Sequence, residues 1–370
     1  MTTTLPSVIF NTEKTDYKNT PLFLGQEPGL LDSVHKTHPE IFNLYKKMKS
    51  LDWDENEFNY STCNQEFKEV PKSQYQAMVY TLAYQWEADT VATRSIASIL
   101  APFITSSELW GATLAISTNE FLHALTYSEI VRNSFDNPEE VFEEILEVTE
   151  TFSRLEEVAN IFAEVYDVSH RYALKQASKE EAYDAVMFFY VALYCLERIQ
   201  FISSFAVTFA FGEMGMFMPI AKAVQKICQD EFEVHQVLDR VVIQQELSTK
   251  QGIDWYNRNR EKISKIINSV YESEVNWSKF ICGDGRELPG LNEERLIKGV
   301  QFNAQPVYDT LHIQLPFERI EKNPLPYMED WMNVNAIQAA PQEEVGRNSA
   351  YLMGGIVDRS TPKEYDVSDL

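Results

Sequence analysis

Basic residues are scarce in this sequence. Lysine and arginine together number 32, against 56 aspartate and glutamate residues, which gives a formal net charge of −24. Proteins that bind nucleic acid gain most of their affinity by neutralising phosphate charge with basic side chains. The charge therefore excludes nucleic-acid binding as the main role, and we expect no nucleic-acid partner.

Cysteine is also rare, and the arrangement of the cysteines excludes two kinds of site. No two of them form a CxxC pair, and their spacing fits neither a zinc site nor a small disulfide framework: they are Cys63, Cys195, Cys228 and Cys282. The N-terminus lacks the basic start and apolar run of a signal peptide. These features predict a reducing, cytoplasmic location.

A charge-free apolar run of membrane-spanning length is missing as well. The nearest candidate, Met187 to Phe211, contains Glu197, Arg198 and Gln200 near its middle. A charge at the centre of a lone membrane span is costly. We therefore expect a helix buried in protein, no membrane contact, and a partner that compensates the charge of Glu197.

Glycine and proline are almost absent from the middle of the chain. No glycine lies between Gly29 and Gly111 or between Gly111 and Gly212, and Pro138 is the single proline within residues 103–218. Long stretches without these residues favour long helices. The predicted helices cover Gln74–Leu100, Ser107–Asn133, Pro138–Lys175, Lys179–Phe211, Phe217–Leu247 and Trp255–Cys282. The sequence therefore predicts an all-α fold.

The two ends differ from this helical middle. Residues 1–35 are rich in proline and glycine and predict an extended N-terminal arm. Residues 321–370 contain further prolines and close with the polar sequence RSTPKEYDVSDL, which predicts a flexible C-terminal tail. We expect one helical domain over residues 36–320, with an arm before it and a tail after it.

Four acidic residues and two histidines lie in predicted helices that are largely apolar. They occur in the motifs YQWEADT, NEFLHALTY, CLERIQF and QDEFEVH, and are Asp89, Glu120, His123, Glu197, Glu231 and His235. Buried charges of this kind are costly unless something neutralises them. Two divalent metal ions would do so, as in the ferritin-like bundles that bind a metal pair with carboxylates and histidines from four helices. Oxygen and nitrogen ligands suit iron or manganese.

Alternatives remain open at several of these positions. Glu87 could replace Asp89 as a ligand, and Glu197 could be a core glutamate paired with a neighbouring arginine. The spacing of Glu120, His123 and Tyr127 places all three on one face of a helix. Tyr127 could be an ordinary buried tyrosine, or it could lie one turn from a ligand and be oxidised.

With these motifs in order, the chain resembles the radical-generating small subunit of class I ribonucleotide reductase. The resemblance runs from PLFLGQEPGLL and LDWDENEFN, through NEFLHALTYSEIVRN, LERIQFISSFAVTFAFGE and ICQDE, to LPFERIEKNPLP and AIQAAPQEE. It implies a ferritin-like helical bundle in which Asp89, Glu120 and His123 bind one metal. Glu197, Glu231 and His235 would bind the other metal, and Glu120, Glu197 or Glu231 could bridge the two metals.

The resemblance also implies a mechanism. The reduced metal pair, two iron ions with manganese as the alternative, activates dioxygen, and the resulting oxidant takes an electron and a proton from Tyr127. The apolar pocket that shields the radical falls on Phe201, Phe205 and Ile227. The radical hole then passes to the large subunit, which reduces ribonucleoside diphosphates to deoxyribonucleotides.

The route and the partners follow from the same resemblance. The hole would leave through His123, Asp230 and Trp53, and Tyr351 in the tail would pass it between subunits. The expected partners are the large subunit, docked through the C-terminal tail, a second copy of the chain in a homodimer, and a small redox protein that reduces the metals.

One motif departs from the family pattern. The family has glutamate and histidine three residues apart in the last metal helix, whereas Glu231 and His235 are four apart, with Glu233 between them. A single π-helical turn is a common way for a helix to absorb one extra residue at a functional site. We therefore expect Glu231 and His235 to be the ligands, with Glu233 as the alternative, in a helix that bulges locally.

Two other functions fit parts of this pattern. A stand-alone di-metal oxidase or hydroxylase could use the same bundle on a small molecule, and a ferritin-like protein could bind metal without catalysis. A stand-alone oxidase has no need of Trp53, Asp230, Tyr351 and a docking tail together, and a metal-binding protein has no need of an oxidisable Tyr127.

Overall fold

The computed structural model describes residues 11, 15–26 and 29–333, and over these residues the chain is helical. Within that part there is no β-strand, only isolated bridges between Phe23 and Ile104 and between Leu288 and Leu291. The longer helices are α1 (Pro39–Ser50), α3 (Lys72–Leu100), α4 (Ser107–Ser134), α5 (Pro138–Leu146), α6 (Thr149–Ala173), α7 (Lys179–Cys195), α8 (Ile202–Glu213), α9 (Met218–Asp230), α10 (Gln236–Leu247), α11 (Lys250–Cys282) and α12 (Glu293–Thr310). The short elements are η1 (Tyr60–Thr62), α2 (Cys63–Glu69), η2 (Leu196–Gln200), η3 (Glu231–His235) and α13 (Tyr327–Met332). The all-α prediction is confirmed.

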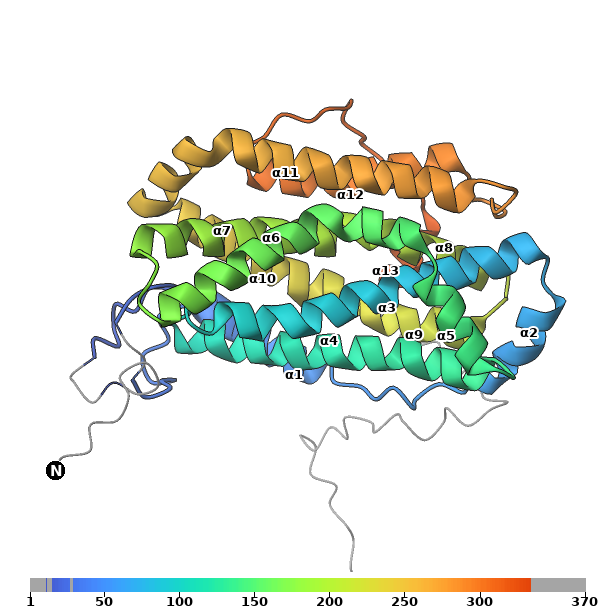
Figure 1. The fold of residues 1–370 in the computed structure, drawn as a ribbon, viewed down its shortest axis with the longest axis horizontal. Coiled ribbons are helices and arrows are strands. Elements are labelled where there is room, and N and C mark those ends of the chain that lie inside the picture. The colour runs from blue at the N-terminus through green and yellow to red at the C-terminus, as the bar shows by residue number, and fades with distance from the viewer. Residues whose placement is uncertain (1–10, 12–14, 27–28, 334–370) are drawn as a thin grey trace, which may run out of the picture. The chain divides into compact units, whose positions relative to one another are not determined.

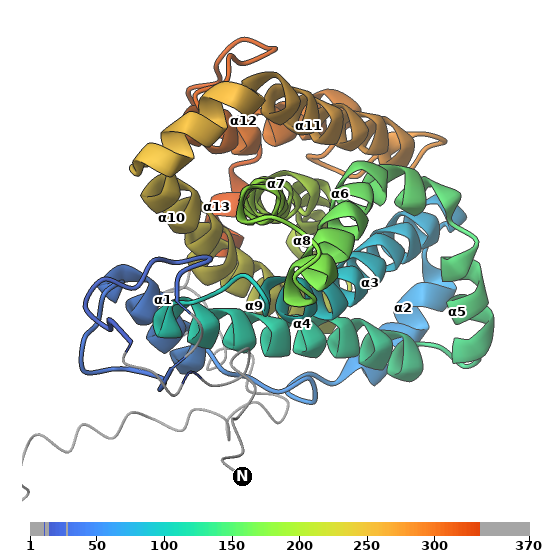
Figure 2. The ribbon, with the colours of Figure 1, turned by 60° about the vertical axis from the view of Figure 1, so that its left-hand side comes forward.

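The helices pack as a bundle around α7. Figure 1 shows α11 and α12 along one side of the bundle and α4 with α1 along the other, with α3, α6 and α7 between them. In Figure 2 α7 is viewed nearly end-on, surrounded by α6, α10, α11 and α12. Almost every residue of α7 and α8 is buried. The apolar segment from Met187 to Phe211 is therefore the centre of the core.

An apolar segment as long as Met187 to Phe211 could form a membrane span instead of a core helix. The continuous helical stretch Lys179–Glu213 is long and apolar enough to cross a bilayer, but 94% of its most apolar window is buried inside the protein. The prediction that this segment is buried in protein is confirmed, because the bundle covers it.

Two of the predicted helices contain a π-helical turn. The helix expected over Phe217–Leu247 consists of α9, η3 and α10, and η3 is the π-helical turn that the spacing of Glu231 and His235 predicted. The helix expected over Lys179–Phe211 consists of α7, η2 and α8, and its π-helical turn, η2, was not predicted. Glu197 lies in η2, so each of the two later acidic motifs lies on a π-helical turn.

One predicted helix is divided. The segment Pro138–Lys175 forms α5 and α6 instead of a single helix, because Val148 leaves the helical conformation, with φ −77° and ψ 87°. The side chain of Val148 is buried and its carbonyl accepts a hydrogen bond from the hydroxyl of Thr151 at 2.6 Å. A β-branched pair at Val148 and Thr149 has low helix propensity, and the buried contact outweighs helix continuation here.

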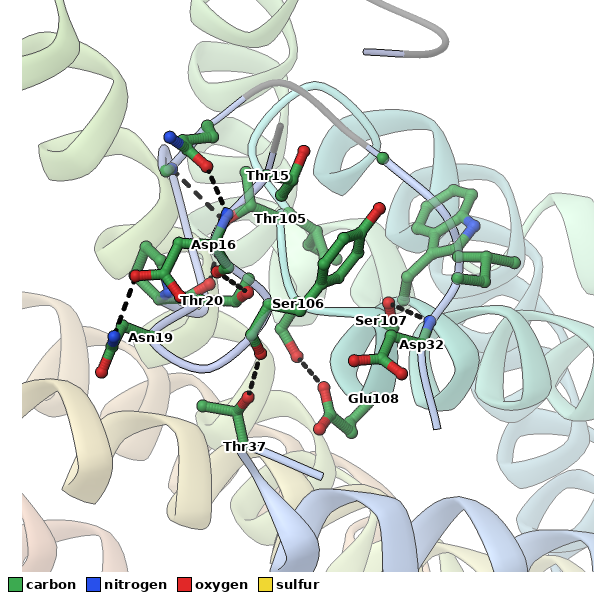
Figure 3. Close-up of a pocket in the computed structure, with 18 of the residues that line it drawn as sticks. Thr15, Asp16, Asn19, Thr20, Asp32, Thr37, Thr105, Ser106, Ser107 and Glu108 are labelled. Carbon is green, nitrogen blue, oxygen red and sulfur yellow. Dashed lines mark hydrogen bonds between the residues drawn. The ribbon is translucent and has the colours of Figure 1, made fainter. Parts of the chain in front are cut away.

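The described part of the N-terminal arm lies against the turn between α3 and α4. Leu22 and Phe23 are buried, the amide of Leu24 donates to the carbonyl of Phe103 at 2.8 Å, and the amide of Thr105 donates to the carbonyl of Leu22 at 2.9 Å. A cavity of about 790 Å³ lies between the arm and this turn, lined largely by polar side chains (Figure 3). None of the six predicted metal ligands lines it. The arm cavity is therefore separate from the candidate site.

Candidate metal centre

The six predicted ligands meet inside the bundle. Asp89 comes from α3, Glu120 and His123 from α4, Glu197 from η2, and Glu231 and His235 from η3. None of the six is more than 2% exposed. Four ionisable carboxyl groups and two imidazoles thus share one water-excluded region, where unpaired charge is strongly disfavoured.

The six residues form two groups with the spacing of metal sites. Potential ligand atoms of Asp89, Glu120 and His123 lie within 4.8 Å of one another, and so do those of Glu120, Glu197, Glu231 and His235. Glu120 belongs to both groups. A carboxylate shared in this way can bridge two metal ions, with one oxygen toward each.

Most ligand atoms of the cluster have no hydrogen-bond partner. This is true of both carboxyl oxygens of Asp89, Glu120 and Glu231 and of Oε2 of Glu197. It is also true of Nδ1 of His123 and of His235, which lie close to carboxyl oxygens of the cluster itself: His123 is 3.1 Å from Oε1 of Glu231, and His235 is 2.9 Å from Oε1 of Glu120 and 3.0 Å from Oε2 of Glu231. Buried polar atoms are rarely left unpartnered. Oxygen and imidazole donors in this arrangement fit two divalent cations of the iron or manganese type.

Protons can take the place of such cations. Burial raises the pKa of Asp89, and the nearby charge of Glu120 raises it further. Burial likewise raises the pKa of Glu197, together with the charges of Glu231 and Glu120. Burial lowers the pKa of His235, but the carboxylates of Glu231 and Glu120 outweigh this and raise it to about 10. Asp89, Glu197 and His235 therefore favour their protonated forms in the metal-free cluster, whereas burial raises the pKa of Glu231 but the charge of His235 outweighs this and lowers it.

Each histidine makes its second contact away from the cluster. Nε2 of His123 lies 3.1 Å from Oδ2 of Asp230, and the indole nitrogen of Trp53 donates to the same oxygen at 2.8 Å. Nε2 of His235 lies 2.8 Å from Oδ1 of Asn119, whose amide nitrogen donates to Asp230 at 3.0 Å. These outer contacts fix each imidazole so that Nδ1 points at the cluster.

Asn119 was not predicted as a site residue. It precedes Glu120 in the sequence, yet its side chain joins His235 to Asp230 through two hydrogen bonds. An asparagine beside a ligand carries no pattern that distinguishes this role from an ordinary polar position, because its partners come from other helices.

Tyr127 is completely buried, and its hydroxyl group has no hydrogen-bond partner. Burial raises the pKa of Tyr127, and the charges of Asp89, Glu231 and Glu120 raise it further. The phenol is therefore protonated at neutral pH and lies close enough to the cluster to feel its charge. Phe201, Phe205 and Ile227 are also fully buried, so the predicted pocket residues are inaccessible to water.

The structure separates the alternative ligands from the cluster. Glu233 pairs with Lys47 of α1, and its side chain is 34% exposed. Glu87 belongs to neither metal group. Arg198 does not neutralise Glu197, since its guanidinium lies over the ring of Phe232 at 4.7 Å. Tyr351 lies outside the described residues.

Comparison with known proteins agrees with this geometry. Residues 33–324 match the family model of the ribonucleotide reductase small chain. The ribonucleoside-diphosphate reductase subunit beta of Buchnera aphidicola from Schizaphis graminum is 26% identical, over 96% of this chain and 97% of its own length. The subunit beta of enterobacteria phage T4 is also 26% identical, over 95% of this chain and 96% of its own.

Solved structures share the fold. The R2 subunit of a ribonucleotide reductase from Clostridium botulinum superimposes with a TM-score of 0.75 at 16% identity, covering 88% of this chain and 98% of that one. The dimanganese(II)-NrdF of Streptococcus sanguinis gives a TM-score of 0.65 at 16% identity, covering 80% of this chain and 96% of that one. The matched residues include the whole candidate metal centre, and the chain belongs to the ribonucleotide reductase small chain family.

Proposed function

We propose that this chain, a ribonucleoside-diphosphate reductase small subunit, generates its radical on Tyr127 beside a metal pair held by the six clustered residues. Asp89, Glu120 and His123 would hold one ion, and Glu197, Glu231 and His235 the other. The observation that carries this proposal is the sharing of Glu120 between two groups whose donor atoms lack partners.

The metal pair would supply dioxygen activation and a one-electron oxidant when bound. Iron is the expected metal, and manganese offers the same ligand chemistry. The four carboxylates and two neutral imidazoles would balance the ionic charge, which is why the site can be buried. Displaced protons leave the carboxyl and imidazole groups as the ions enter.

Tyr127 is suited to be the oxidised residue. Its phenol is protonated, so oxidation removes one electron together with the hydroxyl proton. With no hydrogen-bond partner and no contact with water, the resulting radical would be shielded from reductants. Phe201 and Phe205, whose ring centroids are 5.6 Å apart, are buried rings without an exchangeable proton.

A hydrogen-bonded chain provides the proposed exit for the radical hole. Through one oxygen, Oδ2, Asp230 accepts from Trp53 and Asn119 and contacts His123, so that three side chains converge on a single atom. Trp53 and His123 also stack, with ring centroids 6.2 Å apart. The indole proton of Trp53 could shift along its hydrogen bond toward Asp230 as the charge passes, which would limit the charge on the buried ring.

The family works with a large subunit and is typically dimeric. We further propose that residues 321–370 dock the large subunit and that Tyr351 passes the radical hole from this chain to that subunit. We also propose that a small redox protein reduces the metals and that the protein is cytoplasmic. Deleting the last twelve residues should abolish ribonucleotide reduction with the cognate large subunit while leaving metal content unchanged. Full activity of the truncated protein would refute docking through the tail.

Metal analysis of two variants tests the ligand assignment. Glu231→Ala should lose bound metal, because Glu231 lies in the four-residue group. Glu233→Ala is the matched control, since Glu233 lies on the same π-helical turn and pairs with Lys47. It should retain two ions per chain. Metal loss in the Glu233 variant alone would overturn the assignment.

A further inference from the structure

A second buried charged cluster lies at the C-terminal end of η2. Arg154 of α6 and Glu274 of α11 are 2% and 0% exposed. They form a bidentate pair, in which Nε of Arg154 donates to Oε2 of Glu274 and Nη2 donates to Oε1, both at 2.7 Å. We call these two residues the Arg154–Glu274 clamp.

The clamp is bonded to the main chain at the end of η2. Nη2 of Arg154 donates to the backbone carbonyl of Gln200, the last residue of the π-helical turn. Oε1 of Glu274 accepts from the backbone amide of Ser203 at 3.2 Å. Nη1 of Arg154 also donates to the hydroxyl of Ser204 at 3.0 Å. One donor and one acceptor of the backbone are thus satisfied by side chains at the point where the π-helical turn gives way to α8.

Further contacts hold the clamp in place. The side-chain amide of Gln200 donates back to the main-chain carbonyl of Arg154. The guanidinium of Arg154 lies 3.4 Å from the ring centroid of Tyr84 and 4.6 Å from that of Trp277. Tyr84 belongs to α3, the helix that carries Asp89. The clamp therefore ties α3, α6 and α11 to the end of η2.

The geometry of the π-helical turn explains what this attachment can do. A π-helical turn accommodates one residue more than an α-helical turn. One residue of an α-helix corresponds to a rotation of about 100°. If η2 relaxed to α-helical hydrogen bonding, Glu197 would rotate by about that amount relative to α8. Its carboxylate would then leave the group that contains Glu120, Glu231 and His235.

We propose that Arg154 and Glu274 are positioning residues, which keep η2 as a π-helical turn and so hold Glu197 at the metal pair. The inference rests on the proposed function, because it assigns a role to the clamp only if Glu197 binds metal. It concerns one of the two metal positions, since Glu197 belongs to only one of the two ligand groups.

Manganese binding, followed by electron paramagnetic resonance of free Mn²⁺, tests the proposal. The variant is Arg154→Met with Glu274→Met, because replacing a buried ion pair by apolar side chains is often neutral for stability. Wild-type protein should bind two ions per chain. The double variant should bind one ion with unchanged affinity and the second about 10–100-fold more weakly, the usual effect of losing an outer partner of a ligand.

Two further variants separate positioning from general destabilisation. Tyr183→Phe removes a buried hydrogen bond to Glu246, 2.6 Å long and formed between α7 and α10, without touching η2, and should keep both ions. Arg154→Lys keeps a positive charge opposite Glu274, but an ammonium group lacks the several planar N–H donors with which the guanidinium also reaches the carbonyl of Gln200 and the hydroxyl of Ser204. Arg154→Lys should weaken Mn²⁺ binding at the same one of the two metal positions. This variant replaces the double variant if the double variant fails to fold.

The outcomes are distinct. Equal retention of both ions in the double variant or in Arg154→Lys would overturn the inference and leave the proposed function standing. An equal weakening of both positions, or loss of one ion in Tyr183→Phe, would reduce the clamp to a stability role. Wild-type protein that bound no metal pair would overturn the proposed function and the inference together.

Discussion

Two buried charged clusters contact η2, one through Glu197 and one through the main chain at its end, and they differ in how their charge is balanced. The Arg154–Glu274 clamp satisfies its charge internally, since the guanidinium and the carboxylate bond to each other and to the backbone. The cluster around Glu120 has carboxyl oxygens and imidazole nitrogens with no hydrogen-bond partner. Burial alone therefore does not identify a ligand site, and neither do unpartnered atoms alone, since both carboxyl oxygens of Glu87 also lack partners; the site is marked by several such carboxyl and imidazole groups gathered within 4.8 Å of one another.

The same comparison shows why one buried charged cluster destabilises the metal-free protein and the other does not. Unpaired buried carboxylates destabilise the metal-free protein, so the cluster depends on protons or cations. The clamp shares the region without that dependence, because its two charges are of opposite sign and in bidentate contact. The charge of the cluster is thus balanced by protons or metal, whereas the charge of the clamp is balanced by its own two side chains.

Breaking the clamp by a single substitution should have the largest effect on stability. Arg154→Met leaves the carboxylate of Glu274 buried without its partner, and we expect a loss of about 3–5 kcal/mol in the free energy of unfolding of the metal-free protein. Adding Glu274→Met should recover most of this loss. Chemical denaturation of the two variants checks the prediction, and a double variant as unstable as the single one would contradict it.

Metal loading should change the free energy of unfolding by a smaller amount, and this change should depend on pH. The pKa values of Asp89 and Glu197 are raised in the metal-free fold, so their stabilising contribution is complete below their ordinary values and is lost as pH rises through the raised ones. Bound cations require the deprotonated carboxylates. The stabilisation by metal should therefore increase with pH, and binding should release protons.

The size of the stabilisation by metal follows from mass action. At a free metal concentration one hundred times the dissociation constant, one ion stabilises the fold by about 2.7 kcal/mol. Thermal unfolding with and without Mn²⁺ at several pH values, together with proton release in calorimetry, measures both effects. A metal-induced stabilisation that was the same at every pH would contradict the charge balance described for the cluster.

The sequence predicted the metal cluster well because helical spacing reports which residues share a face. The motifs NEFLHALTY and QDEFEVH place Glu120 with His123, and Glu231 with His235, on common faces, and the extra residue in the second motif predicted its π-helical turn. The all-α class followed from the lack of glycine and proline. The common faces and the all-α class depend on local sequence, whereas the π-helical turn was predicted from the way Glu231 and His235 depart from the spacing in the resembled family.

Features that depend on distant contacts were not predicted. Arg154 and Glu274 are far apart in the sequence, and neither lies in a motif, so their pairing appears only when α6 and α11 pack. The π-helical turn η2 has no extra residue between two ligands to reveal it. Asn119 and the break at Val148 are likewise set by tertiary contacts that outweigh local preference.

The central claim is that Tyr127 is oxidised beside the metal cluster. Electron paramagnetic resonance on protein loaded with ferrous iron and exposed to air tests it most directly, with Tyr127→Phe as the comparison. We predict a tyrosyl signal in the wild-type protein and none in the variant, with equal iron content in both. A wild-type sample without a tyrosyl signal, or a variant that retained one, would contradict the account.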